Sequence, residues 1–227
     1  MRSFLRLLIV LAVPIVLTMM MVRLLTLPWY PAWQYGRPGF PPDPLGMPRE
    51  ERLRLAQASI RFLNIPWSTD MLAELHFDDG TPAYQERELE HMDDVKAVYN
   101  GLTLLALVMG AAALIAVWAL LHQPGAVNGS CRAIWTSLTQ GAIMTLGLIV
   151  SLGVWMLISF DLFFTVFHQL FFEPGTWLFS YSDTLIRLFP LPLWQDAGLI
   201  IAGGVSALSL LLIALGVWRG QRCGAGS

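Results

Sequence analysis

Long apolar runs alternate with polar connections along this chain of 227 residues. Four runs are long enough to cross a bilayer as helices, which rise about 1.5 Å per residue. They lie at 4–22, 97–121, 133–160 and 197–218. The first run is predicted to be an uncleaved anchor, because no small-x-small cleavage site follows it. The pattern predicts an all-α membrane protein with four transmembrane helices, forming a single domain over residues 1–227.

Basic and acidic residues are separated along the chain. All 16 Asp and Glu residues fall within the two long connections, 27–96 and 161–196. The N-terminus, the 122–132 segment and the C-terminus carry arginine without Asp or Glu: Arg2, Arg6, Arg132, Arg219 and Arg222. Because cytoplasmic loops carry excess Lys and Arg, we expect both termini to be cytoplasmic. The two connections are then expected to form an extracytoplasmic cap.

The first connection combines an irregular part with helices. Its Pro- and Gly-rich beginning, 27–47, is expected to be irregular. The pattern from Pro48 to Leu63 predicts an amphipathic helix that Pro66 ends. The run at 84–96 has no helix breaker, so we expect a helix that continues into the second span and holds His91 above it.

The second connection is rich in aromatic residues. Residues 162–172 are expected to continue the third span as an aromatic helix with His168 in its middle. Asp183 and Arg187 are four residues apart, which favours a pair within a short helix. Four spans would therefore bring His91 and His168 to the same depth of one small bundle.

Residues within and next to the spans lead to two structural predictions. Small residues recur four apart, as in Gly147 with Ser151 and Gly203 with Ala207, and are predicted to be helix-packing positions. Cys131 and Cys223 both fall on the predicted cytoplasmic side, where we expect no disulfide.

The histidines have structural as well as functional interpretations. His168 among phenylalanines is typical of a buried neutral histidine bonded to a carbonyl, but polar side chains at membrane depth also mark functional sites. A desolvated histidine keeps the neutral form that a general base needs. His91 lies in a charge-rich run, so it could also be an ordinary residue on a solvated helix face. His76 and His122 are expected to be surface residues.

The sequence gives little support to several other functional classes. HExxH, CxxC and GxSxG motifs are absent, and Glu88 with His91 gives only half of a carboxylate-bridged metal pattern. The cores of spans two to four contain no Asp, Glu, Lys or Arg, which argues against an ion-coupled transporter. A net charge of -2 argues against a nucleic-acid partner.

Two runs carry a family resemblance. The sequence ERELEHMDDV at 86–95 and the sequence FHQLFFEPGTWLF at 167–179, followed by DTLIRLFP at 183–190, resemble the lipoprotein intramolecular transacylase family of bacterial membrane proteins. The four-span layout, with a long first and a shorter second outer connection, is similar to that family throughout.

The resemblance implies a bacterial plasma-membrane enzyme whose active site faces the extracytoplasmic side. Its substrates would be diacylglyceryl-modified lipoproteins within membrane lipid. It would move the sn-2 acyl chain to the α-amino group of the N-terminal cysteine, giving a lyso-form lipoprotein. No cofactor or metal is implied. His168 is expected to act as base and His91 as its polarising partner. Further candidates for binding or orienting the substrate are Arg187, Tyr181, Glu88, Asp94 and Trp177.

Two alternatives stay open at this stage. The cap could be a non-catalytic surface that binds an envelope partner, in which case both histidines would tolerate substitution. The protein could also be a metal-dependent membrane hydrolase using Glu88, His91 and His168, although these supply few ligands for a zinc site.

Overall fold

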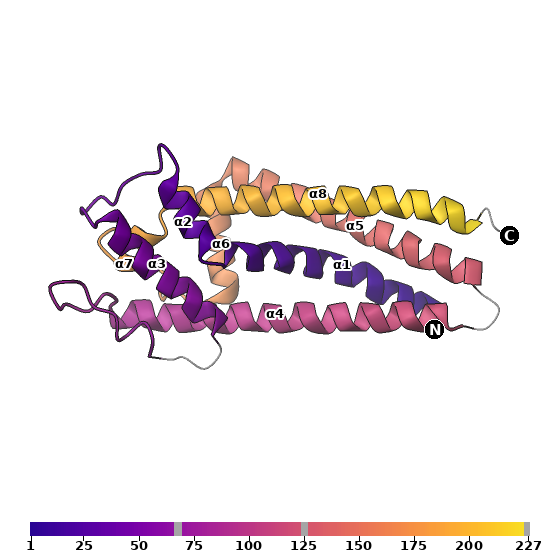
Figure 1. Ribbon diagram of the computed structural model, residues 1–227, viewed down its shortest axis with the longest axis horizontal. Coiled ribbons are helices and arrows are strands. Elements are labelled where there is room, and N and C mark those ends of the chain that lie inside the picture. Colours follow the sequence, from indigo (N-terminus) through magenta and orange to yellow (C-terminus); the bar gives the residue numbers. More distant parts are fainter. Residues whose placement is uncertain (66–69, 124–126, 225–227) are drawn as a thin grey trace. The chain divides into compact units, whose positions relative to one another are not determined.

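Helices make up most of the computed structural model, which describes residues 1–65, 70–123 and 127–224 (Figure 1). The helices are α1 (Arg2–Leu25), α2 (Trp29–Gly36), α3 (Arg49–Asn64), α4 (Glu86–Leu121), α5 (Val127–Ile158), α6 (Phe160–Phe171), α7 (Thr184–Leu188) and α8 (Leu191–Gly224). Within those ranges, β structure is limited to one bridge between His76 and Pro82. Helices α1, α4, α5 and α8 are long and apolar enough to cross a membrane, so the all-α class and the four spans are confirmed.

Two compact units divide the chain, and several helices continue from one into the other. The first, here called the span unit, comprises Met1–Val22, Leu102–Ile158 and Leu199–Ser227. The second, here called the loop unit, comprises Arg23–Gly101 and Ser159–Gly198. The two predicted connections, 27–96 and 161–196, fall within the loop unit.

The span unit contains two small apolar clusters, and both include residues of α1. One cluster joins α1, α4 and α5 through Ile9, Ala116, Leu120 and Ile134. The other joins α1, α5 and α8 through Met21, Ile149 and Val205. Figure 1 shows the beginning of α1 and the end of α8 at the same end of this unit.

Close helix approaches in the span unit occur at glycines other than those predicted. A Cβ atom on Gly147 or Gly203 would meet no atom within 4 Å, so the prediction that these glycines pack helices together is wrong. A Cβ on Gly141 would instead lie 2.8 Å from the Val10 carbonyl oxygen, and one on Gly216 would lie 2.0 Å from Thr139 Oγ1. Four-residue spacing of small residues does not tell which helix face is covered, because that depends on the partner helix.

A disulfide joins Cys131 of α5 to Cys223 of α8, contrary to the expectation from their predicted compartment. Their Cα atoms are 5.9 Å apart, a spacing that suits a disulfide. The reason is the tight packing of α5 against α8 around Gly216, which brings these helices together near the end where both cysteines lie.

In the loop unit, the segment expected to be irregular begins with a helix. Helix α2 covers Trp29–Gly36, so the prediction for 27–47 is wrong over its first part. Pro31 is compatible with this helix because it lies in the first turn, where backbone N–H groups have no helical partner. Residues 40–43 and 46–48 then have no regular helix, and Gly46 takes a positive φ of 80°.

Two of the predicted helices in the loop unit are confirmed. Helix α3 covers Arg49–Asn64 and packs against both α2 and α7; Pro66, which was expected to end it, lies outside the described residues. Helix α4 begins at Glu86 and continues without interruption to Leu121.

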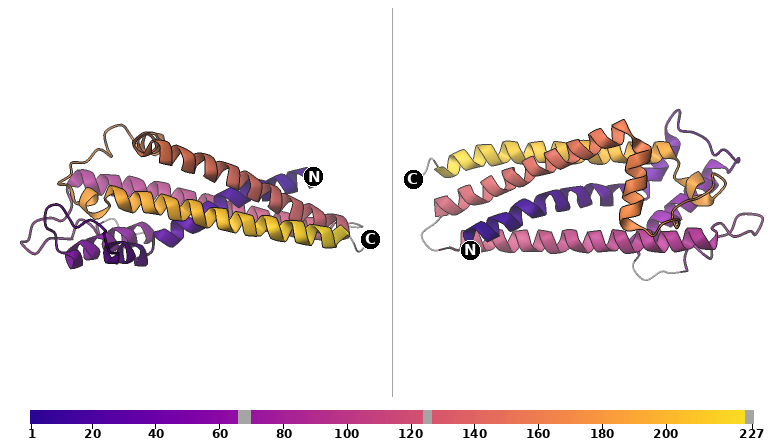
Figure 2. Two further views of the ribbon diagram at one scale, coloured as in Figure 1. Left: turned by 90° about the horizontal axis from the view of Figure 1, so that it is seen from above. Right: turned by 180° about the vertical axis from the view of Figure 1, so that it is seen from behind.

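The aromatic helix does not continue the third span as predicted. Helix α5 ends at Ile158, Ser159 has φ -152° and ψ 89°, and α6 starts afresh at Phe160. Extended dihedral angles at Ser159 interrupt the helical hydrogen bonds, so α5 and α6 are two separate helices. Within the loop unit, Figure 2 shows the C-terminal end of α6 beside α4. This end carries His168.

Candidate active site

Two imidazole rings face each other in the loop unit. His91 comes from the first turns of α4 and His168 from the second half of α6. Their ring centroids are 6.2 Å apart and their planes differ by 20°. One small functional group can therefore reach both rings. The structure brings the two predicted histidines together, while their chemical role stays a prediction.

The hydrogen bond of His168 defines its tautomer. Its Nδ1 lies 2.8 Å from the carbonyl oxygen of Phe164, one helical turn earlier. A carbonyl oxygen only accepts, so Nδ1 carries the hydrogen and Nε2 keeps the lone pair in the neutral ring. Burial lowers the pKa of His168 from its ordinary value of 6.5, and the bond to Phe164 opposes this only in part. The lowered pKa favours the neutral form of the His168 ring.

Aromatic rings surround the pair on most sides. The ring of Phe172 is 5.0 Å from that of His91 and 5.5 Å from that of His168, so it contacts both. Phe179 lies 5.3 Å from His91, and Trp177 lies 4.9 Å from His168. This environment is apolar, and it strengthens any electrostatic interaction made inside it.

Two buried polar atoms in this cluster have no hydrogen-bond partner: Nδ1 of His91, whose residue is 9% exposed, and Nε1 of Trp177. A buried polar atom without a partner costs free energy, and native structures keep few of them. The indole N–H can only donate. The indole N–H is therefore available to a ligand that brings an acceptor, and Nδ1 of His91 is available as a donor or an acceptor according to the tautomer of the ring.

Glu88 and Asp183 hold the residues around the pair in place. Glu88 is fully buried and accepts hydrogen bonds from the backbone N–H groups of Gln85, at 2.8 Å, and Leu185, at 2.7 Å. Asp183, which is 1% exposed, accepts two bonds of 2.8 Å from the Nη2 atom of Arg87. These contacts fasten the chain around 180–185 to the first turn of α4. Through its bond to the Leu185 N–H, Glu88 positions the chain close to the histidines.

Arg187 lies in a different cluster. Its Nε and Nη2 donate to the two carboxylate oxygens of Asp43, at 3.0 and 2.9 Å. The expected pair of Arg187 with Asp183 is therefore wrong: Asp183 binds Arg87, and α7 turns Arg187 toward the segment at 40–48. The same carboxylate accepts the N–H of Met47 at 2.8 Å.

The two remaining candidate residues for substrate binding, Tyr181 and Asp94, are exposed to solvent. Tyr181 is 89% exposed, and Asp94 is exposed three residues after His91. The Asp94 carboxylate acts on His91 electrostatically and raises the pKa of that ring, against the larger lowering by burial. The roles of both residues stay predictions. Across the described ranges, no three His, Cys, Asp or Glu side chains are grouped as metal ligands would be.

Sequence reasoning missed several residues that shape this region. Asp43 lies in the Pro-rich segment, and Phe172 and Phe179 were taken only as part of an aromatic run. Asp183 was considered only as a partner of Arg187, and Arg87 only as part of the charge-rich run around His91. Charge alone does not show which opposite charges pair, so sequence carried no signal for the Arg87–Asp183 contact.

Fold and site together define a multi-pass membrane protein with two histidines in an aromatic cluster. The model of the family described as lipoprotein intramolecular transacylase Lit matches residues 5–194. The chain belongs to this family. Membership supports intramolecular transacylation as its general activity and lipoproteins as its substrates.

Individual proteins resemble this chain over nearly its full length. A protein of Aquifex aeolicus (strain VF5), described as uncharacterized, is 27% identical over 217 residues, covering 96% of this chain and 95% of that protein. An in meso structure of Lit from Bacillus cereus with one histidine replaced by arginine has a TM-score of 0.72 at 19% identity, covering 100% of this chain and 95% of that one. A second Bacillus cereus Lit structure has a TM-score of 0.66 at 17% identity, covering 98% and 97%. At these identities the structures show the shared fold.

Proposed function

We propose that this protein moves the sn-2 acyl chain of a diacylglyceryl-modified lipoprotein to the α-amino group of its N-terminal cysteine. The observation that carries the proposal is the pairing of His168, with its lone pair on Nε2, and His91 inside one aromatic cluster. The active site faces the extracytoplasmic side, as the arginine distribution and the cap predicted from it indicate.

His168 acts as the base in this scheme. The amine nitrogen attacks the ester carbonyl carbon, and Nε2 of His168 takes the proton that the nitrogen loses. A nitrogen–carbon bond forms, the bond to the glyceryl sn-2 oxygen breaks, and the proton passes to that oxygen. Ester and amine belong to one molecule, so positioning removes much of the entropic barrier. The product is the lyso-form lipoprotein.

His91 and Trp177 stabilise the oxyanion. The carbonyl oxygen gains negative charge when the amine attacks, and preorganised donors in a dry site stabilise such charge strongly. The indole N–H of Trp177 and an N–H of His91 supply these donors. Both residues have a buried ring nitrogen without a partner in the described structure, which supports their assignment.

A lipopeptide with a deuterated sn-2 chain tests the reaction. We expect purified protein to convert it to an isomer of unchanged mass, with the label on the α-nitrogen by fragment mass spectrometry. An N-acetylated lipopeptide is the matched control and is expected to stay unchanged, because it has no free amine. Label from sn-1, released fatty acid, or exchange of label between two substrate molecules would each overturn the proposal.

Substituting Trp177 with Phe removes the N–H and keeps an aromatic ring. We expect kcat to fall about a hundredfold, the lower end for loss of one oxyanion donor. The midpoint of thermal unfolding, Tm, should stay equal or rise, because an unpaired buried donor disappears. Trp194→Phe is the control, since that indole donates to the Phe189 carbonyl at 2.9 Å, and its kcat should change little. Unchanged kcat in Trp177→Phe would remove Trp177 from the mechanism.

A further inference from the structure

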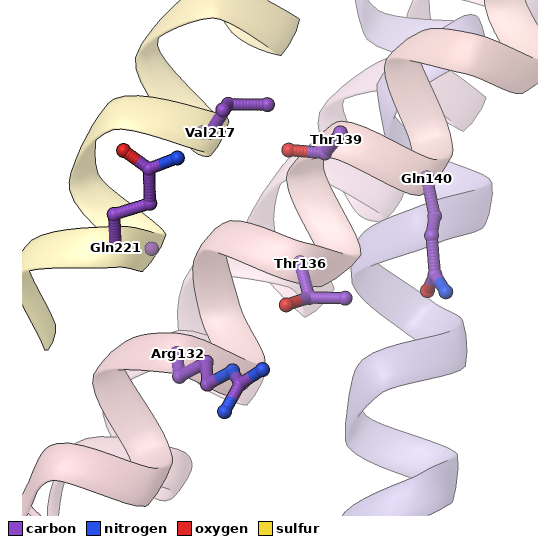
Figure 3. Close-up of a pocket in the computed structure, with 8 residues that line it drawn as sticks. Arg132, Thr136, Thr139, Gln140, Val217 and Gln221 are labelled. Atoms are coloured by element: carbon purple, nitrogen blue, oxygen red, sulfur yellow. The ribbon is translucent and has the colours of Figure 1, made fainter. Parts of the chain in front are cut away.

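A groove in the span unit lies between α5 and α8 and has a volume of about 400 Å³. Helix α5 contributes one arginine, two threonines and a glutamine to its lining, and α8 contributes two glycines, a valine and a glutamine. Figure 3 shows Thr139 pointing from α5 toward α8, from which Val217 and Gln221 project. A second groove of about 310 Å³ adjoins the first, shares Arg132 and Thr136 with it, and adds Arg6.

The charge around these grooves has one sign. All 16 Asp and Glu residues of the chain fall within 27–96 and 161–196, so the span unit contains none. Arg132 is exposed and lies in both grooves, and Arg6 lies in the second. Two guanidinium groups without a carboxylate side chain in their unit attract an anion.

The groove lies along α5 and α8 at the level where lipid headgroups are expected. Arg132 directly precedes the apolar run 133–160, and Gly220 and Gln221 follow the apolar run that ends at 218. The groove therefore spans the boundary between apolar and polar segments, where lipid phosphates lie. Val217 is 52% exposed and Trp218 is 44% exposed beside it, as expected for side chains that contact lipid.

We infer that the two adjoining grooves together bind the phosphate of an anionic phospholipid. Arg132 and Thr136, which line both grooves, hold it, with Arg6 from the second groove and Gln221 from the first. Basic pockets between transmembrane helices recognise such headgroups in this way. Guanidinium groups suit phosphate because their N–H groups form paired bonds to its oxygens. The family's acyl-transfer chemistry does not enter this inference.

Gly220 gives a way to fill the groove without disturbing the fold. A Cβ there would meet no atom within 4 Å, whereas one on Gly216 would lie 2.0 Å from Thr139 Oγ1. Gly220→Leu therefore places a side chain in open space at the groove. Gly203→Leu on the same helix is the matched control, because a Cβ there also meets nothing within 4 Å and Gly203 does not line the groove.

Native mass spectrometry of the full chain in detergent tests the inference with phosphatidylglycerol, phosphatidylcholine and inorganic phosphate. We expect preferential binding of phosphatidylglycerol. Arg132→Gln should weaken it about fivefold, as for loss of one basic residue near the membrane surface. Gly220→Leu should weaken it at least as much, and Gly203→Leu should leave it unchanged.

Other outcomes would overturn the inference. Equal binding of phosphatidylglycerol and phosphatidylcholine, or unchanged lipid binding in Arg132→Gln and Gly220→Leu, would exclude an anionic lipid site in this groove. Displacement of phosphatidylglycerol by millimolar inorganic phosphate would assign the site to free phosphate. Measuring Tm for Arg132→Gln, Gly220→Leu and Gly203→Leu would reveal a folding defect in any of them. Arg132→Lys keeps the positive charge and is expected to bind more lipid than Arg132→Gln.

Discussion

Substituting His168 with Ala is expected to lower kcat for acyl transfer about a thousandfold, within the range for loss of a general base. The reason is that Nε2 of His168 carries the lone pair, because Nδ1 donates to the Phe164 carbonyl. The variant loses the group that takes the proton from the attacking amine, while its aromatic neighbours stay. The measurement is conversion of a diacylglyceryl lipopeptide followed by mass spectrometry.

His122→Ala is a closely matched control. The Nδ1 atom of His122 is also bonded, at 2.8 Å, to the carbonyl of the aromatic residue four positions earlier, Trp118, and the two ring centroids are 4.6 Å apart. The same local contacts are therefore lost without loss of the proposed base. Its kcat should equal that of the wild type. Normal conversion by His168→Ala, or an equal loss in His122→Ala, would contradict the assignment.

The pH dependence separates a catalytic role from a structural one. Burial lowers the pKa of His168 from 6.5, so the neutral base persists as the pH falls somewhat below that value. Activity should be lost as the pH falls through the lowered pKa, because the protonated ring cannot accept another proton. The residual activity of His168→Ala should lack this acidic limb. An unchanged pH profile in the variant would show that another group titrates.

Features that depend on local sequence were predicted well. The four spans follow from the length of apolar runs, and the helix that holds His91 follows from the absence of a breaker between 84 and 96. The adjacency of His91 and His168 was also predicted, although α6 is a separate helix and not the predicted continuation of the third span. Each signal is contained in a continuous stretch of sequence.

Features that depend on tertiary contacts were not predicted. Asp183 has oppositely charged candidates at Arg87 and Arg187, and only the folded chain shows that it binds Arg87. Gly147 and Gly216 are both glycines in spans, but only Gly216 lies against another helix. The break at Ser159 interrupts a run that remains apolar on both sides, so hydropathy carries no sign of it.

Substituting Asp43 with Asn is expected to destabilise the loop unit by about 3 kcal/mol, as for a buried ion pair that loses one partner. The Asp43 side chain is fully buried and that of Arg187 is 13% exposed, so solvent screens the pair weakly. The variant leaves a buried guanidinium without its counterion and weakens the acceptor for the N–H of Met47. A loss of this size corresponds to a fall in Tm of roughly 6–12 °C, measured by thermal unfolding in detergent.

The pH dependence of this loss follows from the pKa of Asp43. Burial alone would raise that pKa, but hydrogen bonds from Arg187 and the N–H of Met47 outweigh it and lower the pKa below 3.8. A carboxylate with a lowered pKa stabilises the fold above its unfolded value and loses that effect as the pH falls through the folded one. The Tm difference between wild type and Asp43→Asn should therefore be full near neutral pH and shrink in acid. Asp78→Asn, at an exposed loop carboxylate, should show no Tm change. An equal Tm for wild type and Asp43→Asn at neutral pH would show that the ion pair does not hold α7 to the segment at 40–48.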